Sequence, residues 1–249
     1  MGGGQQRART GAGRGNVGVF KLTNLDARVQ GHLSRVYATL AAASLMSAVG
    51  CYLFLSIGLP LWLTQVGALG CLLALNLTPA SASNLGKRHA YLFGFAFAQG
   101  AAMGPLVGAA LTISPASIVT ACLCTTTVFV SFSLSALLTQ RRSFLYLGGF
   151  LAAATAAMLA LRLGGWLFGA SGITYPFELY GGLLVFAVYI LYDTQLIVER
   201  ASAGEMDTVR HSLDLLVDLL AIFVRILIIL LKRAEDDKRK DKEQARKRR

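Results

Sequence analysis

Long apolar segments dominate the chain and have the length of membrane-spanning helices. Residues 36–86 contain no Asp, Glu, Lys or Arg, and neither do residues 89–140. A helix of about 20 residues crosses a bilayer core, so each stretch is long enough for two spans. Glycine and proline interrupt the first stretch at residues 58–60, and proline interrupts the second at residues 112–116. The pattern therefore predicts four spans in the first 140 residues.

Three more apolar segments follow in the second half of the chain. They cover residues 143–161, 179–198 and 213–231. Small residues such as Gly94 and Gly100 recur in the apolar segments, and close helix packing in lipid depends on such residues. The sequence thus predicts an all-α integral membrane protein with six to seven transmembrane helices in a compact bundle.

Composition and charge agree with a membrane protein. Hydrophobic residues make up 55% of the chain and charged residues only 15%, whereas soluble domains carry about 25% charged residues. The net charge of +11 comes mainly from the two ends, where basic tails beside apolar segments are typical of anchors next to anionic lipid. No folded basic surface for nucleic acid is indicated. We divide the chain into a flexible basic cytosolic N-terminus (1–30), a transmembrane bundle (31–231) and a basic cytosolic tail (232–249).

The positive-inside rule orients the predicted spans, except the last. With a cytosolic N-terminus, Lys87, Arg88, Arg141 and Arg142 all fall on the cytosolic side. A full crossing by the seventh segment would move a tail with many Lys and Arg residues out of the cytosol. Either this segment is re-entrant, or packing overrides the charge rule. We favour both termini in the cytosol.

The seventh segment carries a polar stripe. Asp214, Asp218 and Arg225 fall within about 40° of each other around a helix, and Arg210 and His211 lie near the same line. A charge at membrane depth costs at least about 2.5–3.5 kcal/mol on insertion scales, so the stripe is expected to face the protein interior or a wet cavity. The alternatives are an interfacial amphipathic helix and an Asp–Arg pair that only holds helices together.

One more acid, Asp193, lies near the end of the sixth segment. The short connection to the seventh segment makes the two helices antiparallel neighbours, which would bring Asp193 close to Asp214 and Asp218. Two close, partly buried carboxylates cannot both ionise cheaply, so a pair should share one proton. This arrangement predicts a pH switch.

The remaining candidate chemistry is weak. No Ser/His/Asp set, phosphate loop or cluster of metal ligands stands out, so we predict no enzyme and no cofactor. The cysteines lie in apolar stretches and are expected to be small buried hydrophobes; they are Cys51, Cys71, Cys122 and Cys124. The histidines lie at or near span ends, where we expect water to reach them; they are His32, His89 and His211.

Several motifs together are more specific. They are residues 94–100 (GFAFAQG), 104–106 (GPL), 141–149 (RRSFLYLGG) and 192–197 (YDTQLI). In order and spacing the chain resembles the transmembrane Bax inhibitor motif family over about residues 30–240. Residues 32–37 (HLSRVY) and the basic tail resemble the Bax inhibitor branch of that family.

The resemblance implies a multi-pass protein of the endoplasmic-reticulum membrane that suppresses programmed cell death and leaks calcium in a pH-dependent way, as a channel or a calcium/proton exchanger. It also implies that an aspartate pair controls the path, and the pair falls on Asp193 and Asp218, with Asp214 as competitor for the second position. Calcium prefers six to eight oxygen ligands, so this pair would bind it weakly and transiently. Relatives usually have an aromatic residue after the second acid, where this chain has Leu219.

The tail is expected to be at least partly helical, because it contains acid-first pairs four residues apart. These pairs are Glu235/Arg239, Asp236/Lys240 and Glu243/Lys247. The resemblance adds calmodulin and Bcl-type cell-death regulators as partners of the tail, besides membrane lipids; a solvated stop-transfer tail is the alternative. The alternative function for the whole chain is a non-conducting membrane adaptor that regulates cell-death and stress-response proteins by direct contact.

Overall fold

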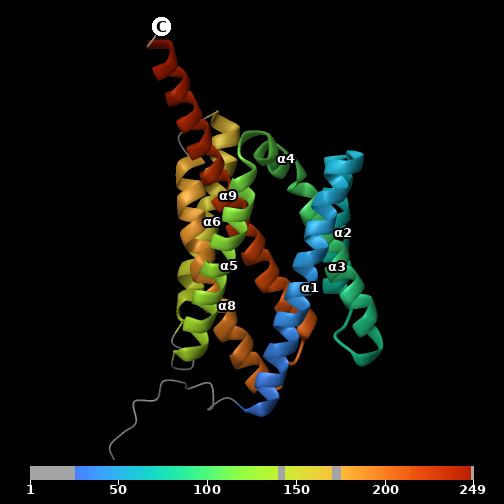
Figure 1. The fold of residues 1–249 in the computed structure, drawn as a ribbon. Helices are drawn as coiled ribbons and strands as arrows, with labels where there is room; N and C mark the ends of the chain where they lie inside the picture. Colours follow the sequence, from blue (N-terminus) through green and yellow to red (C-terminus); the bar gives the residue numbers. More distant parts are fainter. Residues whose placement is uncertain (1–25, 140–143, 170–174, 248–249) are drawn as a thin grey trace, which may run out of the picture.

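The computed structural model describes residues 26–139, 144–169 and 175–247, and its regular structure within these ranges is helical (Figure 1). The main helices are α1 (Ala27–Ile57), α2 (Leu61–Leu77), α3 (Leu85–Ala102), α4 (Gly104–Ile113), α5 (Pro115–Leu138), α6 (Leu147–Phe168), α8 (Gly182–Ser202) and α9 (Thr208–Lys247). Two short turns, η2 (Ala82–Asn84) and the π-helical η3 (Phe177–Gly181), precede α3 and α8. The predicted all-α architecture is confirmed.

The predicted breaks between the first spans lie where glycine and proline stop a helix. Helix α1 ends at Ile57 because Gly58 adopts a left-handed conformation (φ 67°) that glycine tolerates without a steric penalty. Helix α5 begins at Pro115, whose missing N–H is not needed in a first helical turn. The third predicted span is not straight: α3 and α4 meet at Met103 with a bend of 42°.

By length and composition, four helices of the described chain can cross a membrane, or five if α3 and α4 count as one span. Helix α2 is apolar but shorter, and α9 carries the polar stripe. Large apolar side chains cover the outside of the bundle, among them Leu45, Trp62, Leu123 and Trp166. A surface of this kind suits contact with lipid, where apolar exposure carries no hydrophobic penalty.

Helix α9 is a single unbroken helix of 40 residues. It begins at the end of the bundle where α1 begins and finishes at the opposite end (Figure 1), and it packs against α1, α5 and α8. Buried residues occur along it from Val209 to Leu231. The described segment therefore does not turn back on itself, and it runs along the bundle from one end to the other.

We expect protease added to sealed microsomes to remove an N-terminal tag and to leave a C-terminal tag protected. The reason is the course of α9, which carries the chain from one end of the bundle to the other. Removal of both tags would support the positive-inside expectation instead, and it would require α9 to leave the position that it has between α1, α5 and α8. The cytosolic location of both ends, which the charge rule favours, is therefore the competing outcome of this experiment. Residues 1–25 and Arg141–Arg142 lie outside the described ranges.

Helices α1 and α3 approach each other unusually closely through the first motif. A Cβ atom added at Gly100 would overlap the backbone carbonyl of Ser47, and one added at Gly50 would overlap that of Phe97. Ser47 Oγ also donates a hydrogen bond of 2.9 Å to the Ala96 carbonyl. Small residues at this crossing let the two backbones touch, as the sequence pattern predicts.

Replacing Gly100 by alanine should destabilise the bundle by about 1–3 kcal/mol, the usual cost of overpacking, because α1 and α3 must move apart. Gly31→Ala is the matched control, since Gly31 is also helical and a Cβ there meets nothing within 4 Å; it should be neutral or stabilising by up to about 1 kcal/mol. Thermal unfolding of both variants in detergent measures the difference. Equal midpoints would show that the α1–α3 contact is not tight.

Candidate ion and proton site

The sequence-predicted pair of acids meets inside the bundle. Asp193 of α8 and Asp218 of α9 lie close enough for their carboxyl groups to interact directly, and Asp218 is only 3% exposed. An ionised carboxylate has no donor, so two such groups can hydrogen-bond only when one of them carries a proton. Oδ2 of Asp218 has no hydrogen-bond partner in the described part of the chain. The pair can therefore accept a further donor or cation.

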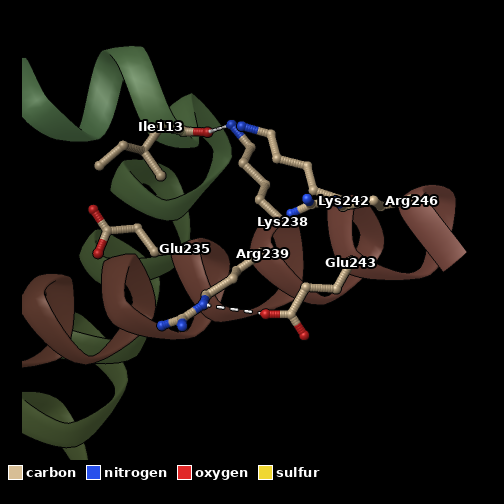
Figure 2. A pocket seen from close by; sticks show the side chains of 7 residues that line it. All are labelled: Ile113, Glu235, Lys238, Arg239, Lys242, Glu243 and Arg246. Atoms are coloured by element: carbon tan, nitrogen blue, oxygen red, sulfur yellow. Dashed lines mark hydrogen bonds and ion pairs between the residues drawn. The ribbon is translucent and has the colours of Figure 1, made fainter.

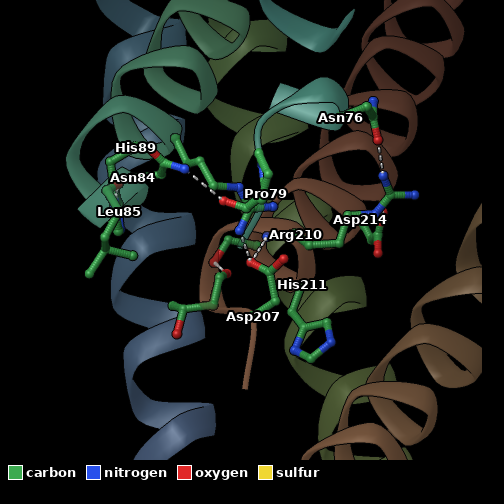
Figure 3. Close-up of polar contacts among 12 residues, drawn as sticks. Asn76, Pro79, Asn84, Leu85, His89, Asp207, Arg210, His211 and Asp214 are labelled. Carbon is green, nitrogen blue, oxygen red and sulfur yellow. Dashed lines mark hydrogen bonds and ion pairs between the residues drawn. The ribbon is translucent and has the colours of Figure 1, made fainter. Parts of the chain in front are cut away.

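Asp214 lies one turn before Asp218 but has a different partner. Its Oδ1 is 3.3 Å from Nε of Arg210, and Arg210 also donates from Nη1 to the Asn76 side chain of α2 (Figure 3). The arginine thus compensates the charge of Asp214 and ties it to α2. Of the two candidates on α9, Asp218 is the one whose carboxyl group can share a proton with that of Asp193, and Asp214 acts on Asp193 through its charge.

These acids face a cavity of about 490 Å³ between α2, α3, α6, α8 and α9. Polar side chains that line the cavity include Asn76, Tyr189, Asp193, Arg210, Asp214 and Asp218. A cavity of this size with several convergent polar groups can hold water and a hydrated cation. The polar stripe of α9 therefore faces an open pocket between helices near its start, in line with the cost of placing charge in lipid.

Arg225 does not join the acids. Its guanidinium carbon lies 4.5 Å from the ring centre of Phe186 on α8, and its Nη1 donates to the Ala221 carbonyl at 3.0 Å. A Cβ at Gly182 would overlap the Arg225 side chain, so this glycine provides the space for it. The structure therefore gives Arg225 a packing role between α8 and α9, away from the predicted ion pathway.

The expectation that water reaches all three histidines is wrong. His32 and His211 are both fully buried, and Nε2 of His32 lies 2.9 Å from Nδ1 of His211. His211 therefore turns from the acid stripe toward α1. The available sequence signal was helical spacing, since His32 lies between the buried Val29 and Val36 and His211 lies four residues before the buried Leu215.

A buried ion pair between Arg88 and Asp207 holds the start of α9 in place. From the sequence, Arg88 was expected only to contribute charge to a cytosolic loop. Nη1 of Arg88 on α3 donates to Asp207 Oδ1 at 2.7 Å, and the same oxygen accepts from the backbone N–H of Arg210 in the first turn of α9 (Figure 3). Burial alone would raise the pKa of Asp207, but the hydrogen bonds from Arg88 and Arg210 outweigh it and lower that pKa. Arg88 and Asp207 thus position the helix that carries Asp214 and Asp218.

The motif around Asp193 holds α8 in place. The Gln195 side chain accepts a hydrogen bond of 2.7 Å from the Phe144 backbone N–H and donates one of 3.3 Å to the Ala136 carbonyl of α5. Thr194, between the two motif residues, is fully buried. The amide of Gln195 therefore fastens α8 to the neighbouring helices two residues after Asp193.

The tail is helical as predicted, because α9 continues through it to Lys247. Lys238 Nζ donates to the Ile113 carbonyl at the end of α4, and Arg239 Nε lies 3.5 Å from Glu243 Oε1 (Figure 2). In this ion pair the base precedes the acid, unlike in the predicted pairs. Together with Lys242 and Arg246, these side chains line a shallow basic pocket that suits an anionic headgroup.

The four cysteines are free, and not all are buried. Cys51 and Cys71 are half-buried, whereas Cys122 and Cys124 are exposed on α5. The expectation that all four cysteines are buried is wrong for Cys122 and Cys124. The reason is that an apolar helix in a membrane bundle can face lipid as well as the core. In the described residues, no group of three or more His, Cys, Asp or Glu side chains could hold a metal ion.

Comparison with known proteins agrees with the motifs. The family model described as "Inhibitor of apoptosis-promoting Bax1" matches residues 29–235. Bax inhibitor 1 of Arabidopsis thaliana is 43% identical over 84% of this chain and 83% of its own length. The Oryza sativa protein of that name is 39% identical over 96% and 95%, and the Homo sapiens protein is 36% identical over 90% and 94%. The chain therefore belongs to the Bax inhibitor family and is a multi-pass, all-α membrane protein.

Proposed function

We propose that this protein suppresses programmed cell death in the endoplasmic-reticulum membrane by letting calcium leave the lumen in a pH-dependent way. The observation that carries the proposal is the closeness of the Asp193 and Asp218 carboxyl groups at a polar pocket between helices. The names of the relatives support the link with cell death. Calcium is the transported species and not a resident cofactor.

The shared proton gives the pair two states. With one proton between them, Asp193 and Asp218 hold α8 and α9 together, and the site carries less negative charge. Loss of that proton leaves two carboxylates in contact, which repel each other and attract a cation. Calcium can then replace the proton, with water completing its oxygen ligands, and leave again because two carboxylates bind it weakly. A passive leak and a calcium/proton exchange both use this step.

Purified full-length protein in calcium-loaded liposomes tests the proposal. Calcium release should exceed that of protein-free liposomes and should change steeply with pH. A potassium-selective readout on the same liposomes shows whether the path prefers the divalent ion. If folded protein gives no release at any pH, the conducting function is excluded for this chain.

The second candidate function is a non-conducting adaptor, and the ion pairs favour it. Arg88 with Asp207 joins the start of α9 to α3. Arg210, which pairs with Asp214 within α9, donates to Asn76 of α2, so part of the polar stripe can be explained as fastening helices. An adaptor would bind cell-death or stress-response proteins while calcium release stayed at background. The liposome experiment therefore separates the two functions.

The tail is proposed to regulate and not to conduct, because its charges follow the last apolar residue of α9, Leu231. Deleting residues 232–249 should change binding to anionic lipid while calcium release persists. Complete loss of release in a folded truncation would contradict this. Calmodulin and Bcl-type regulators are proposed partners of the tail only if the protease experiment places the tail in the cytosol.

A further inference from the structure

Two fully buried histidines, which are 179 positions apart in the sequence, connect α1 with α9. His32 on α1 and His211 on α9 have ring centres 5.1 Å apart and nearly perpendicular rings, and Nε2 of His32 is 2.9 Å from Nδ1 of His211. Next to this contact, Ser212 Oγ donates to the Val36 carbonyl at 3.0 Å. The start of α9 is therefore fastened to α1 by side-chain hydrogen bonds.

The chemistry of two imidazoles limits how many protons this contact tolerates. A neutral imidazole has one donor and one acceptor nitrogen, so a neutral pair holds one N–H···N bond. A first added proton can go to the outer acceptor nitrogen without breaking that bond. A second must go to the nitrogen that accepts the bond, which removes the bond and leaves two cations in contact.

One of the two outer nitrogens of the neutral pair is a free acceptor and can take the first proton. His32 Nδ1 and His211 Nε2 are buried, and neither has a hydrogen-bond partner among the described residues. Buried polar atoms without partners are uncommon in folded proteins and call for an explanation. An acceptor nitrogen held in this way can bind a proton.

The charged groups near the two histidines come from α1, α3, α8 and the start of α9. Arg35 of α1, Arg200 of α8 and Arg210 of α9 act on the rings as cations, and Asp207 acts on both as an anion. Asp207 is itself held by Arg88 of α3. Burial and the three arginines oppose a proton on either ring, and the single anion, Asp207, offsets them only in part.

We propose that His32 and His211 form a second proton-binding site, separate from the aspartate pair, that ties the start of α9 to α1 until both rings are protonated. Its ligand is the proton itself, and its effect is on the helix that carries Asp214 and Asp218. Asp218 lies seven residues after His211, two helical turns along α9. The site does not depend on calcium transport, so it can be tested independently of the proposed function.

Thermal unfolding of the full-length protein in detergent between pH 7.5 and 5.0 tests this site. An unfolded chain binds a proton on each imidazole near pH 6.5, whereas the folded pair is expected to bind at most one before the contact breaks. The unfolded state then binds more protons in acid, so stability falls as pH decreases. Each proton of difference makes the folding equilibrium constant fall about tenfold per pH unit below about pH 6.

The double variant H32N/H211N keeps polar side chains of similar shape without titration. Its midpoint should fall less between pH 7.5 and 5.0 than that of the wild type, whereas H89N, at a partly exposed histidine, should behave like the wild type. Equal pH dependence of H32N/H211N and wild type would overturn the proposal. The single variants should be non-additive at pH 7.5, since each alone breaks the same contact.

A measurement on the wild type covers the case in which the double variant does not fold. Hydrogen–deuterium exchange at the imidazole C2 position, followed by mass spectrometry, reports the ionisation of each histidine. His32 and His211 should give linked curves with two steps. Independent single-step curves for His32 and His211 would overturn the proposal.

Discussion

Replacing Asp218 by asparagine is expected to remove the pH dependence of calcium release from liposomes. Asparagine keeps the shape of the side chain but cannot share a proton as an acid, so the contact with Asp193 no longer switches. A step controlled by one proton changes by up to about tenfold per pH unit, and in the variant this slope should fall to near zero. The measurement is the initial rate of calcium release between pH 6 and 8.

Asp193→Asn should have the same effect, and the double variant should add nothing, because the two carboxyl groups act as one titrating unit. Asp214→Asn is the matched control. It lies one turn from Asp218 on the same helix but pairs with Arg210, so its pH profile should keep the slope of the wild type. This comparison separates the Asp193–Asp218 pair from the general negative charge of the cavity.

Two results would contradict the assignment. If Asp214→Asn abolishes the pH response while Asp218→Asn leaves it intact, the second acid of the switch is Asp214. If none of the three variants changes the response, the stripe on α9 is structural and the adaptor function gains. All variants need unfolding midpoints close to that of the wild type before their rates are compared.

Arg88→Met should cause the largest loss of stability, about 3–5 kcal/mol. Arg88 is 6% exposed and its partner Asp207 is largely buried, so the variant leaves a carboxylate without its main donor. The same carboxylate caps the first turn of α9, and its disturbance should loosen that helix. Lys87→Met is the control, because Lys87 is the exposed neighbour of Arg88 and its loss should cost little.

Thermal unfolding in detergent measures this loss. The double variant R88M/D207L should recover part of the stability, because replacing both partners removes the unpaired buried charge. If Arg88→Met unfolds like the wild type, the ion pair is not strong, and the position of α9 depends on its apolar contacts alone.

The Arg88–Asp207 pair also makes the stability of the fold depend on pH, in a direction that follows from the pKa of Asp207. The pKa of Asp207 in the folded protein is lowered below its ordinary value, so the folded state binds fewer protons than the unfolded state in acid. The stabilisation from Asp207 is complete above its ordinary pKa of about 3.9 and is lost as pH falls through the lowered folded value. Asp207→Asn should therefore unfold with a smaller loss of stability below about pH 4 than the wild type.

Sequence by itself determined the helical class, the places where most helices end, and the closeness of Asp193 to the acids of the last helix. These features depend on local signals. Runs without charge give the spans, Gly58 and Pro115 end or begin helices through their own backbone preferences, and a short connection forces α8 and α9 to be neighbours. The tail was predicted as a helix for the same local reason.

Tertiary structure alone decided which polar groups pair. His32 contacts a residue 179 positions away, and Arg88 contacts one 119 positions away; no periodicity along one helix encodes such distances. The course of α9 was also decided there, because its packing against α1, α5 and α8 carries it from one end of the bundle to the other. Helix faces follow from sequence, but the partner of each buried polar group depends on how helices from distant parts of the chain rotate and pack against one another.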